Sequence, residues 1–399
     1  METTVETTAQ TKGQKASHFS TGLAMFAMFF GAGNIVFPLA MGQIAQDKNA
    51  FGITGLLITA VFVPLTGLLA MLLFEGDFQS FFKRVGKVPG YLIMLLILGL
   101  IGPFGGIPRC MTISHSTLHA CGLEDLSLPL FALVSCVAIF LFTFRPSKLL
   151  PLLGFVLTPL LLLSLFVIIM KGLWGIPPTT ATLQTRWEVF SKGVLEGYNT
   201  MDLLASFFFS SVVLVSLRNG QAADKIPLNE NKRLLNIAIF GSLLAACLLT
   251  TIYVCFSFLS SGYSNTLPDV PNHQLLGALA YHILGPYAGM VAGAVVSFAC
   301  LTTEIALTAV FAGFLHKNLF KEKGSYTFFV LVTLVLAFIV SSLHFEGISA
   351  FIVPILQLFY PALIVLSVAN LLNKLYGFQP VKRFFYGTIA LTLAVQLLL

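Results

Sequence analysis

The stretch Phe29-Phe30-Gly31-Ala32-Gly33-Asn34-Ile35-Val36-Phe37-Pro38 lies within the first long apolar run of this sequence. Two glycines, an asparagine and a proline are costly for a continuous helix. Inside a lipid bilayer, backbone groups freed by such a break are tolerated only where protein or a cavity satisfies them. The stretch therefore predicts a broken helix beside a binding site. The alternatives are a packing kink, in which Gly31 and Gly33 let another helix approach, and a nucleotide-binding loop, which is disfavoured because no strand precedes it.

The composition places the chain in a membrane. Of its 399 residues, 57% are hydrophobic and only 10% are charged, against roughly 25% charged in soluble proteins, and its mean hydropathy is +0.92. These values exclude a soluble globule, a disordered chain and a secreted disulfide scaffold. The net charge of +6 is interpreted as cytoplasmic loops that face anionic membrane lipid, and not as a nucleic-acid footprint.

A membrane-spanning helix needs about 20 mostly apolar residues, and the sequence contains eleven such runs. They are 18–42, 50–74, 89–118, 127–145, 148–170, 191–217, 234–260, 284–315, 325–343, 347–372 and 383–399. The third and eighth are long enough to tilt or to extend past the interface. We therefore expect an all-α polytopic membrane protein. Residues 1–17 are expected to form a disordered cytoplasmic tail.

The positions of the lysines and arginines predict the orientation. With the N-terminus in the cytoplasm, seventeen of the 22 fall on the cytoplasmic side, and five fall outside or within the membrane. The prediction is a multi-pass protein of the bacterial cytoplasmic membrane with a cytoplasmic N-terminus. Because eleven spans leave the C-terminus outside and the chain stops at Leu397-Leu398-Leu399, a missing twelfth helix is also considered.

A second interruption occurs in the sixth run, at Leu195-Glu196-Gly197-Tyr198-Asn199-Thr200-Met201-Asp202. The alternative is that this polar stretch lies at the outer end of the span, where water satisfies it. Two broken spans in corresponding positions of two halves indicate a transporter binding site. The second break follows the first by five spans, which favours a repeated architecture.

A third polar feature is Ser297-Phe298-Ala299-Cys300-Leu301-Thr302-Thr303-Glu304. On a helix, Ala299, Thr302 and Thr303 share one face because they are spaced i, i+3 and i+4. A carbonyl and two hydroxyls are hard oxygen ligands of the kind that suit a small cation. Alternatively, the hydroxyls bond only to the preceding helical turn.

Ionisable residues deep in the spans are costly and indicate function. They are Glu304, Asp202, Glu196 and Arg109. Glu196 and Arg109 can instead extend to an interface, so Glu304 and Asp202 are the candidate coupling residues. His115 and His119 have the spacing of a helical zinc pair, but no third ligand is apparent, and we interpret them as polar packing residues. The six scattered cysteines are interpreted in the same way.

These motifs resemble the bacterial branched-chain amino acid:cation symporter family. The matching stretches are Gly31-Ala32-Gly33-Asn34 with Phe37-Pro38, Gly106-Ile107-Pro108-Arg109, Pro146-Ser147-Lys148-Leu149-Leu150 with Leu157-Thr158-Pro159-Leu160, Ser191-Lys192-Gly193 through Thr200-Met201-Asp202, and Cys300-Leu301-Thr302-Thr303. They run in one order from about residue 20 to 372.

The resemblance implies a five-plus-five inverted repeat like that of the bacterial leucine transporter, with discontinuous helices 1 and 6 and about 11–12 spans. The transporter core is then 18–372, with a first repeat at 18–170, a second at 191–372 and a peripheral C-terminal helix in 373–399.

By the same resemblance, the carbonyls of Ala27, Phe30 and Ala299 and the hydroxyls of Thr302 and Thr303 hold a sodium ion. The substrate lies against Ala32, Gly33, Asn34, Phe30, Tyr198 and Asn199, with its carboxylate at the amides that begin a half-helix.

The implied function is inward symport of leucine, isoleucine or valine with sodium, without an organic cofactor. Because Glu304 stands where the family is expected to have a small or apolar residue, a proton-coupled transporter of another apolar amino acid, such as methionine, is the alternative. An ion channel is disfavoured because no repeated filter is present. An integral-membrane enzyme is disfavoured because no HExxH motif occurs and the histidines are dispersed.

Overall fold

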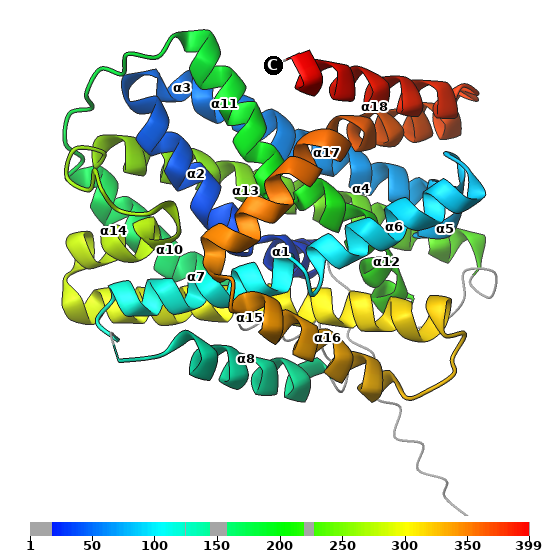
Figure 1. Cartoon of the computed structure of the whole chain (residues 1–399), viewed down its shortest axis with the longest axis horizontal. Helices are drawn as coiled ribbons and strands as arrows, with labels where there is room; N and C mark the ends of the chain where they lie inside the picture. Colours follow the sequence, from blue (N-terminus) through cyan, green and yellow to red (C-terminus); the bar gives the residue numbers. More distant parts are fainter. Residues whose placement is uncertain (1–17, 124, 144–157, 219–226, 399) are drawn as a thin grey trace, which may run out of the picture.

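The computed structural model describes residues 18–123, 125–143, 158–218 and 227–398, which form helices joined by short connections (Figure 1). The principal helices are α1 (His18–Phe29), α2 (Ala32–Ala45), α3 (Asn49–Leu57), α4 (Val63–Leu73), α5 (Phe78–Lys83), α6 (Lys87–Ile101), α7 (Gly106–Ala120), α8 (Leu128–Thr143), α10 (Thr158–Trp174), α11 (Arg186–Asn199), α12 (Asp202–Leu217), α13 (Leu228–Gly262), α14 (Leu275–Leu284), α15 (Pro286–Phe314), α16 (Tyr326–Ser341), α17 (His344–Tyr376) and α18 (Val381–Leu398). The expected tail, 1–17, and the motif at 146–150 and 157 lie outside the described residues.

The described helices confirm an all-helical protein with multiple spans. Six helical segments are long and apolar enough to cross a membrane, and four shorter apolar helices accompany them. Each predicted run coincides with at least one helix. Large apolar side chains on α8 and α16, including Leu141 at 68% and Ile339 at 59% exposure, face away from the protein, as lipid-facing positions do.

The third run differs from the prediction of one long helix that tilts or extends past the interface. It is divided into α6 and α7 by residues 102–105. Gly102, Pro103 and Gly105 explain the division, because proline cannot donate the helical hydrogen bond and glycine weakens the helix on either side. The break leaves Gly106 and Arg109 in the first turn of a new helix, α7.

The two predicted interruptions are confirmed. The first run is divided between α1 and α2 at Phe30 and Gly31, and the sixth is divided between α11 and α12 at Thr200 and Met201. Asp202 is only 3% exposed, so the second break does not lie in water at the end of a span. Both breaks lie in the interior of the protein.

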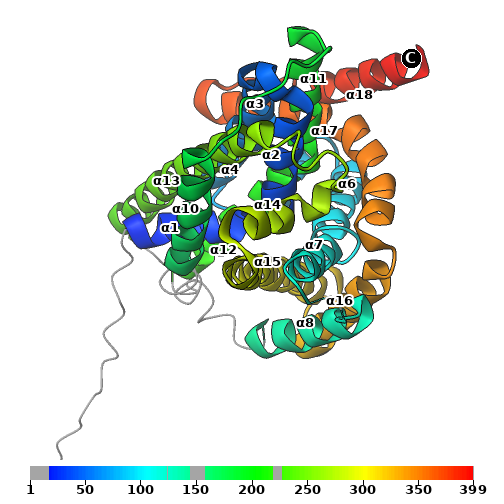
Figure 2. The same ribbon diagram turned by 90° about the vertical axis from the view of Figure 1, so that its left-hand side faces the viewer.

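The helices pack as two groups, visible as the upper left and the lower part of Figure 2. We define the first helix group as α1, α2, α3, α4, α11, α12 and α13, which pack mainly on one another. We define the second helix group as α7, α8, α15 and α16. The helix breaks of the first group face α7 and α15 of the second.

Glycines allow the closest approach within the first group, between α3 and α11. A Cβ atom added at Gly55 would lie 2.3 Å from the carbonyl oxygen of Phe190, and one at Gly193 would lie 2.1 Å from that of Gly52. Only glycine fits at such distances, and small residues are the usual means of close helix packing in membranes. This contact fixes α11, and with it the second break, against the first half of the chain.

Candidate functional site

The first break is capped by the side chain of Asn34. Phe30 and Gly31 separate the two helices, and Gly31 has an extended backbone. Its N–H donates to Oδ1 of Asn34 at 3.0 Å, which caps the start of α2. The first amides of a helix have no intrahelical acceptor and carry the positive end of its dipole. The start of α2 at Ala32 and Gly33 is therefore suited to an anionic group.

The second break contains a strained residue. Met201 lies in the left-handed region with φ 63° and ψ 14°, a conformation that is uncommon for residues other than glycine. The Thr200 hydroxyl accepts a hydrogen bond from the N–H of Asp202 at 3.4 Å. A Cβ atom added at Gly33 would lie 3.0 Å from the Thr200 backbone, so the two breaks lie directly against each other.

A buried polar network joins the two breaks to α13. Asn34 donates through Nδ2 to Oδ2 of Asp202 at 2.7 Å, and it also bonds the hydroxyl of Tyr253. Tyr253 in turn donates to the same carboxylate oxygen at 3.1 Å. Asn34, Asp202 and Tyr253 are each 3% exposed or less. Since an unpaired polar group would be expensive here, the network fixes the two breaks to one another.

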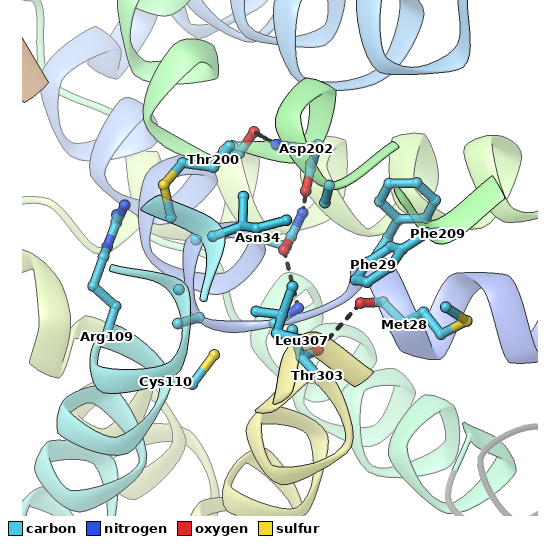
Figure 3. Close-up of a pocket in the computed structure, with 17 residues that line it drawn as sticks. Met28, Phe29, Asn34, Arg109, Cys110, Thr200, Asp202, Phe209, Thr303 and Leu307 are labelled. Carbon is cyan, nitrogen blue, oxygen red and sulfur yellow. Dashed lines mark hydrogen bonds between the residues drawn. The ribbon is translucent and has the colours of Figure 1, made fainter. Parts of the chain in front are cut away.

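A small pocket, with a cavity volume of about 40 Å³, lies at these breaks (Figure 3). Ala32, Gly33 and Asn34 line it from α2, and their contact with substrate stays a prediction. The remaining lining residues come from α1, the second break and α12, the end of α6, and α7 and α15; they are Met28, Phe29, Gly31, Ile101, Gly106, Arg109, Cys110, Thr200, Met201, Asp202, Ala205, Phe209, Thr303 and Leu307. The pocket thus combines apolar walls with a helix start, a carboxylate and a guanidinium.

Five oxygens predicted to form a cation site converge beside this pocket. The hydroxyl of Thr302 lies 3.3 Å from the carbonyl oxygen of Ala27 and 2.7 Å from that of Ala299. The hydroxyl of Thr303 lies 3.5 Å from the Ala27 oxygen and 3.3 Å from that of Phe30. The carbonyl of Met28, 3.4 Å from the same hydroxyl, is a sixth nearby oxygen. Carbonyls freed at the end of α1 therefore face two hydroxyls on α15.

Three predicted substrate residues lie around the pocket rather than in its lining. The ring of Phe30 is fully buried against Phe26, with 5.1 Å between ring centroids. Tyr198 stacks on Tyr360 at 4.5 Å. The side-chain amide of Asn199 donates to Glu196. Their contact with substrate stays a prediction.

Arg109 is the cation that lines the pocket, and it is 2% exposed. Its Nη1 donates to the carbonyl oxygen of Asn199 at 3.1 Å, whereas Nε and Nη2 have no partner. The guanidinium lies over the rings of Phe37, at 4.9 Å, and Phe345, at 5.3 Å. Arg109 therefore does not extend to a membrane interface, which was the alternative considered from the sequence.

Glu304 is 2% exposed on α15, close enough to Cys110 and Cys136 to interact electrostatically with them. It does not line the pocket. His115 bonds the carbonyl oxygen of Leu126 and packs against Phe131, which is the contact of a polar packing residue.

Sequence reasoning missed Tyr253, Cys110, Phe209 and Leu307 as neighbours of the site. A signal existed for Tyr253 alone, because it is a hydroxyl-bearing side chain in a 35-residue apolar helix. The others are ordinary apolar residues of spanning helices, and only their tertiary position distinguishes them.

The family model for branched-chain amino acid transport proteins matches residues 14–398. The chain belongs to this family. It is 31% identical over 364 residues to the branched-chain amino acid permease BraB of Bacillus subtilis, covering 89% of this chain and 80% of the relative. It is 26% identical over 382 residues to putative branched-chain amino acid carrier proteins of Staphylococcus aureus, covering 91% of this chain and 83% of the relatives. The protein is thus a branched-chain amino acid transporter and not an enzyme.

Solved structures support the predicted fold. A manganese transporter of Eremococcus coleocola superposes with a TM-score of 0.62 at 14% identity, over 96% of this chain and 85% of the other. A Na⁺-coupled sialic acid symporter gives 0.59 at 11% identity, over 95% and 89%. Mhp1 in an inward-facing conformation gives 0.52 at 13% identity, over 90% and 77%. These are inverted-repeat transporters of the leucine-transporter fold, and at such identities the likeness concerns the fold alone.

Proposed function

We propose that this transporter is a secondary active symporter, which imports leucine, isoleucine or valine together with sodium by alternating access. The convergence of the α1 carbonyls with Thr302 and Thr303 carries this proposal. Five to six uncharged oxygens suit a hard monovalent cation, because each contributes a partial negative charge without a full carboxylate. The bound ion would join α1, in the first helix group, to α15, in the second.

The substrate's two ends find matching chemistry in the pocket. The amides at Ala32 and Gly33 suit its carboxylate, and the carboxylate of Asp202 suits its ammonium group. Phe29, Phe209 and Leu307 form an apolar lining for an aliphatic side chain. An apolar pocket separates neighbours that differ by one methylene by only about 1–3 kcal/mol. Leucine, isoleucine and valine should therefore share the site, and methionine should enter it.

The lysine and arginine distribution supports the proposed orientation, with a cytoplasmic N-terminus in a bacterial cytoplasmic membrane. The two proposed repeats, 18–170 and 191–372, then each begin with a broken span. In such transporters one part of the structure moves against the other around a fixed central site. Residues of both helix groups line the pocket, so this motion would open it on alternate sides.

A gradient experiment tests the coupling. The full chain is reconstituted into liposomes, and uptake of radiolabelled leucine is measured under an imposed sodium gradient, with choline replacing sodium in matched vesicles, or under an imposed proton gradient. We expect accumulation that requires sodium. Accumulation driven by protons alone would transfer the coupling to a carboxyl group, and absence of leucine uptake under either gradient would contradict the substrate assignment.

The second candidate function is proton-coupled transport of an apolar amino acid such as methionine. Two buried carboxyl groups favour it: Asp202, in the network that joins the breaks, and Glu304, which has no hydrogen-bond or ion-pair partner among the described residues. A carboxyl group in such a place is a natural proton carrier. The proton arm of the gradient experiment, repeated with methionine, tests this candidate.

A further inference from the structure

Arg109 connects the second helix group to the first and to α17. It belongs to α7, in the second group, but its contacts are Phe37 of α2 and the last carbonyl of α11, both in the first group. A third contact, Phe345, lies in the first turn of α17. All these contacts lie on the same side of the helix breaks, which the proposed orientation places toward the outside.

Two of the three guanidinium nitrogens of Arg109 have no hydrogen-bond acceptor. Only Nη1 has a hydrogen-bond acceptor, while the donors on Nε and Nη2 are buried without one. A charged donor that stays buried and unpaired is costly, so a guanidinium serving only to pack helices would be expected to have more partners. The same residue lines the substrate pocket. Its free donors are thus near a place where a carboxylate is expected.

We propose that Arg109 is a positioning residue that closes the outer end of the pocket over the substrate. Nη1 holds α11, the two aromatic contacts hold α2 and α17, and Nε and Nη2 are available to the substrate's carboxylate. The contacts of Arg109 close the pocket in part without ligand, and the substrate's carboxylate would strengthen this closure by supplying the missing acceptor. This inference rests on the proposed substrate site and adds the element that closes it.

The connection that follows α13 is consistent with closure on this side. The short 3₁₀ helix η6 (Asn272–Gln274) packs on α7 and α2, and α14 packs on the same two helices. The ring of His273 lies 5.5 Å from that of Phe345. His273, Phe345, Arg109 and Phe37 therefore form a continuous series of contacts, from the connecting segment to the pocket.

The experiment measures access to the pocket from outside. In a chain whose six native cysteines are replaced, Leu307→Cys places one thiol in the pocket lining. A membrane-impermeant maleimide is added to sealed cells. The labelling rate of this thiol is then compared between the chain that keeps Arg109 and the chains that carry Arg109→Gln or Arg109→Lys. We expect about a tenfold faster rate for Arg109→Gln, since a desolvated cation–π contact and a charged hydrogen bond are both lost. Arg109→Lys keeps the charge but loses the planar fork and should be intermediate.

Arg186→Gln is the matched control. Arg186 also lies over an aromatic ring, that of Phe51 at 5.3 Å, but it is exposed and remote from the pocket. We expect its labelling rate to be unchanged. An equal rate for Arg109 and Arg109→Gln would overturn the proposal, as would an equal increase in the control. If Arg109→Gln does not reach the membrane, the same comparison is decided by Arg109→Lys.

Substrate protection distinguishes this inference from the proposed function. Leucine should slow labelling of the Arg109 protein, and it should do so much less in Arg109→Gln. If leucine protects neither while the mutation still accelerates labelling, the outer closure stands and the leucine assignment fails. If leucine protects both equally, the role of Arg109 in substrate-dependent closure is overturned.

Discussion

Two of the contacts between the helix groups have opposite character. At one, Thr302 and Thr303 of α15 bond carbonyl oxygens at the end of α1, and both hydroxyls have acceptors. At the other, Arg109 of α7 contacts α2 and α11, and two of its donors have none. The first contact is rich in oxygen and would suit a cation, whereas the second is rich in donors and would suit an anion.

This difference suits a carrier of zwitterions that is coupled to a cation. The ion would complete the first contact, and the substrate's carboxylate would complete the second. Each contact would then bind a different ligand. Substitutions at the two places should accordingly affect different properties of transport.

The largest effect is expected at the oxygen-rich contact. Thr302→Ala combined with Thr303→Ala removes two of the five proposed ligands while leaving the backbone carbonyls in place. We expect sodium-driven leucine uptake to be lost, through a decrease in sodium affinity of about 100-fold or more (~2.7 kcal/mol). The measurement is uptake against sodium concentration in proteoliposomes.

The control for this pair is Thr250→Ala with Thr251→Ala. These neighbouring threonines of α13 bond only carbonyls of their own helix, at Ala246 and Cys247. They lose the same two hydroxyls, neither of which bonds a residue of the breaks, and we expect their sodium dependence to match the unmodified chain. Sodium dependence that survives in Thr302→Ala with Thr303→Ala would remove the cation from this contact.

The sequence determined much of the first contact and little of the second. The helix break at Gly31 and the hydroxyl pair on α15 have local signals, because glycine, proline and regular spacing can be recognised without knowing the fold. Arg109 was recognisable only as a charge within a span and as the last residue of the Gly106-Ile107-Pro108-Arg109 stretch. Its aromatic and carbonyl partners come from three other helices, as far away in the chain as Phe345.

The missed division of the third run has a related cause. Gly102 and Pro103 interrupt a strongly apolar segment, and apolar content alone predicted a continuous helix there. Tyr253 illustrates the same limit, since its hydrogen bond to Asn34 joins residues 219 positions apart. Local patterns indicated the breaks at Gly31 and Met201, but tertiary packing decided which side chains meet there.

An intermediate effect is expected at the buried carboxyl groups. Glu304→Gln and Asp202→Asn each replace a group that can bind a proton with an amide that cannot. If protons take part in coupling, we expect Glu304→Gln to change the pH dependence of uptake, measured as initial rate between about pH 5.5 and 8.5. A changed profile in Asp202→Asn alone would assign the coupling to Asp202. Unchanged profiles in both variants would leave sodium as the coupling ion.

The smallest effect is expected at the outer end of the Arg109 contacts. Burial lowers the pKa of His273 below its ordinary value of 6.5, and the nearby His344 acts in the same direction, whereas Glu346 opposes them. His273 is therefore held neutral where it packs on Phe345. Protonation costs more in this packed state than in water, so the packed state loses stability as the pH falls below 6.5 and keeps it above.

We therefore expect outside labelling of Leu307→Cys to accelerate by about two- to threefold between pH 7.5 and 5.5, once the thiol's own pH dependence is removed, because protonation of His273 destabilises the packed state. His273→Gln supplies that correction, because the thiol is the same and the titrating ring is absent. The labelling rate with His273, divided by the rate with His273→Gln, should rise as the pH falls. A constant ratio would mean that the connecting segment does not help Arg109 to close the pocket, and that the guanidinium contacts alone do so.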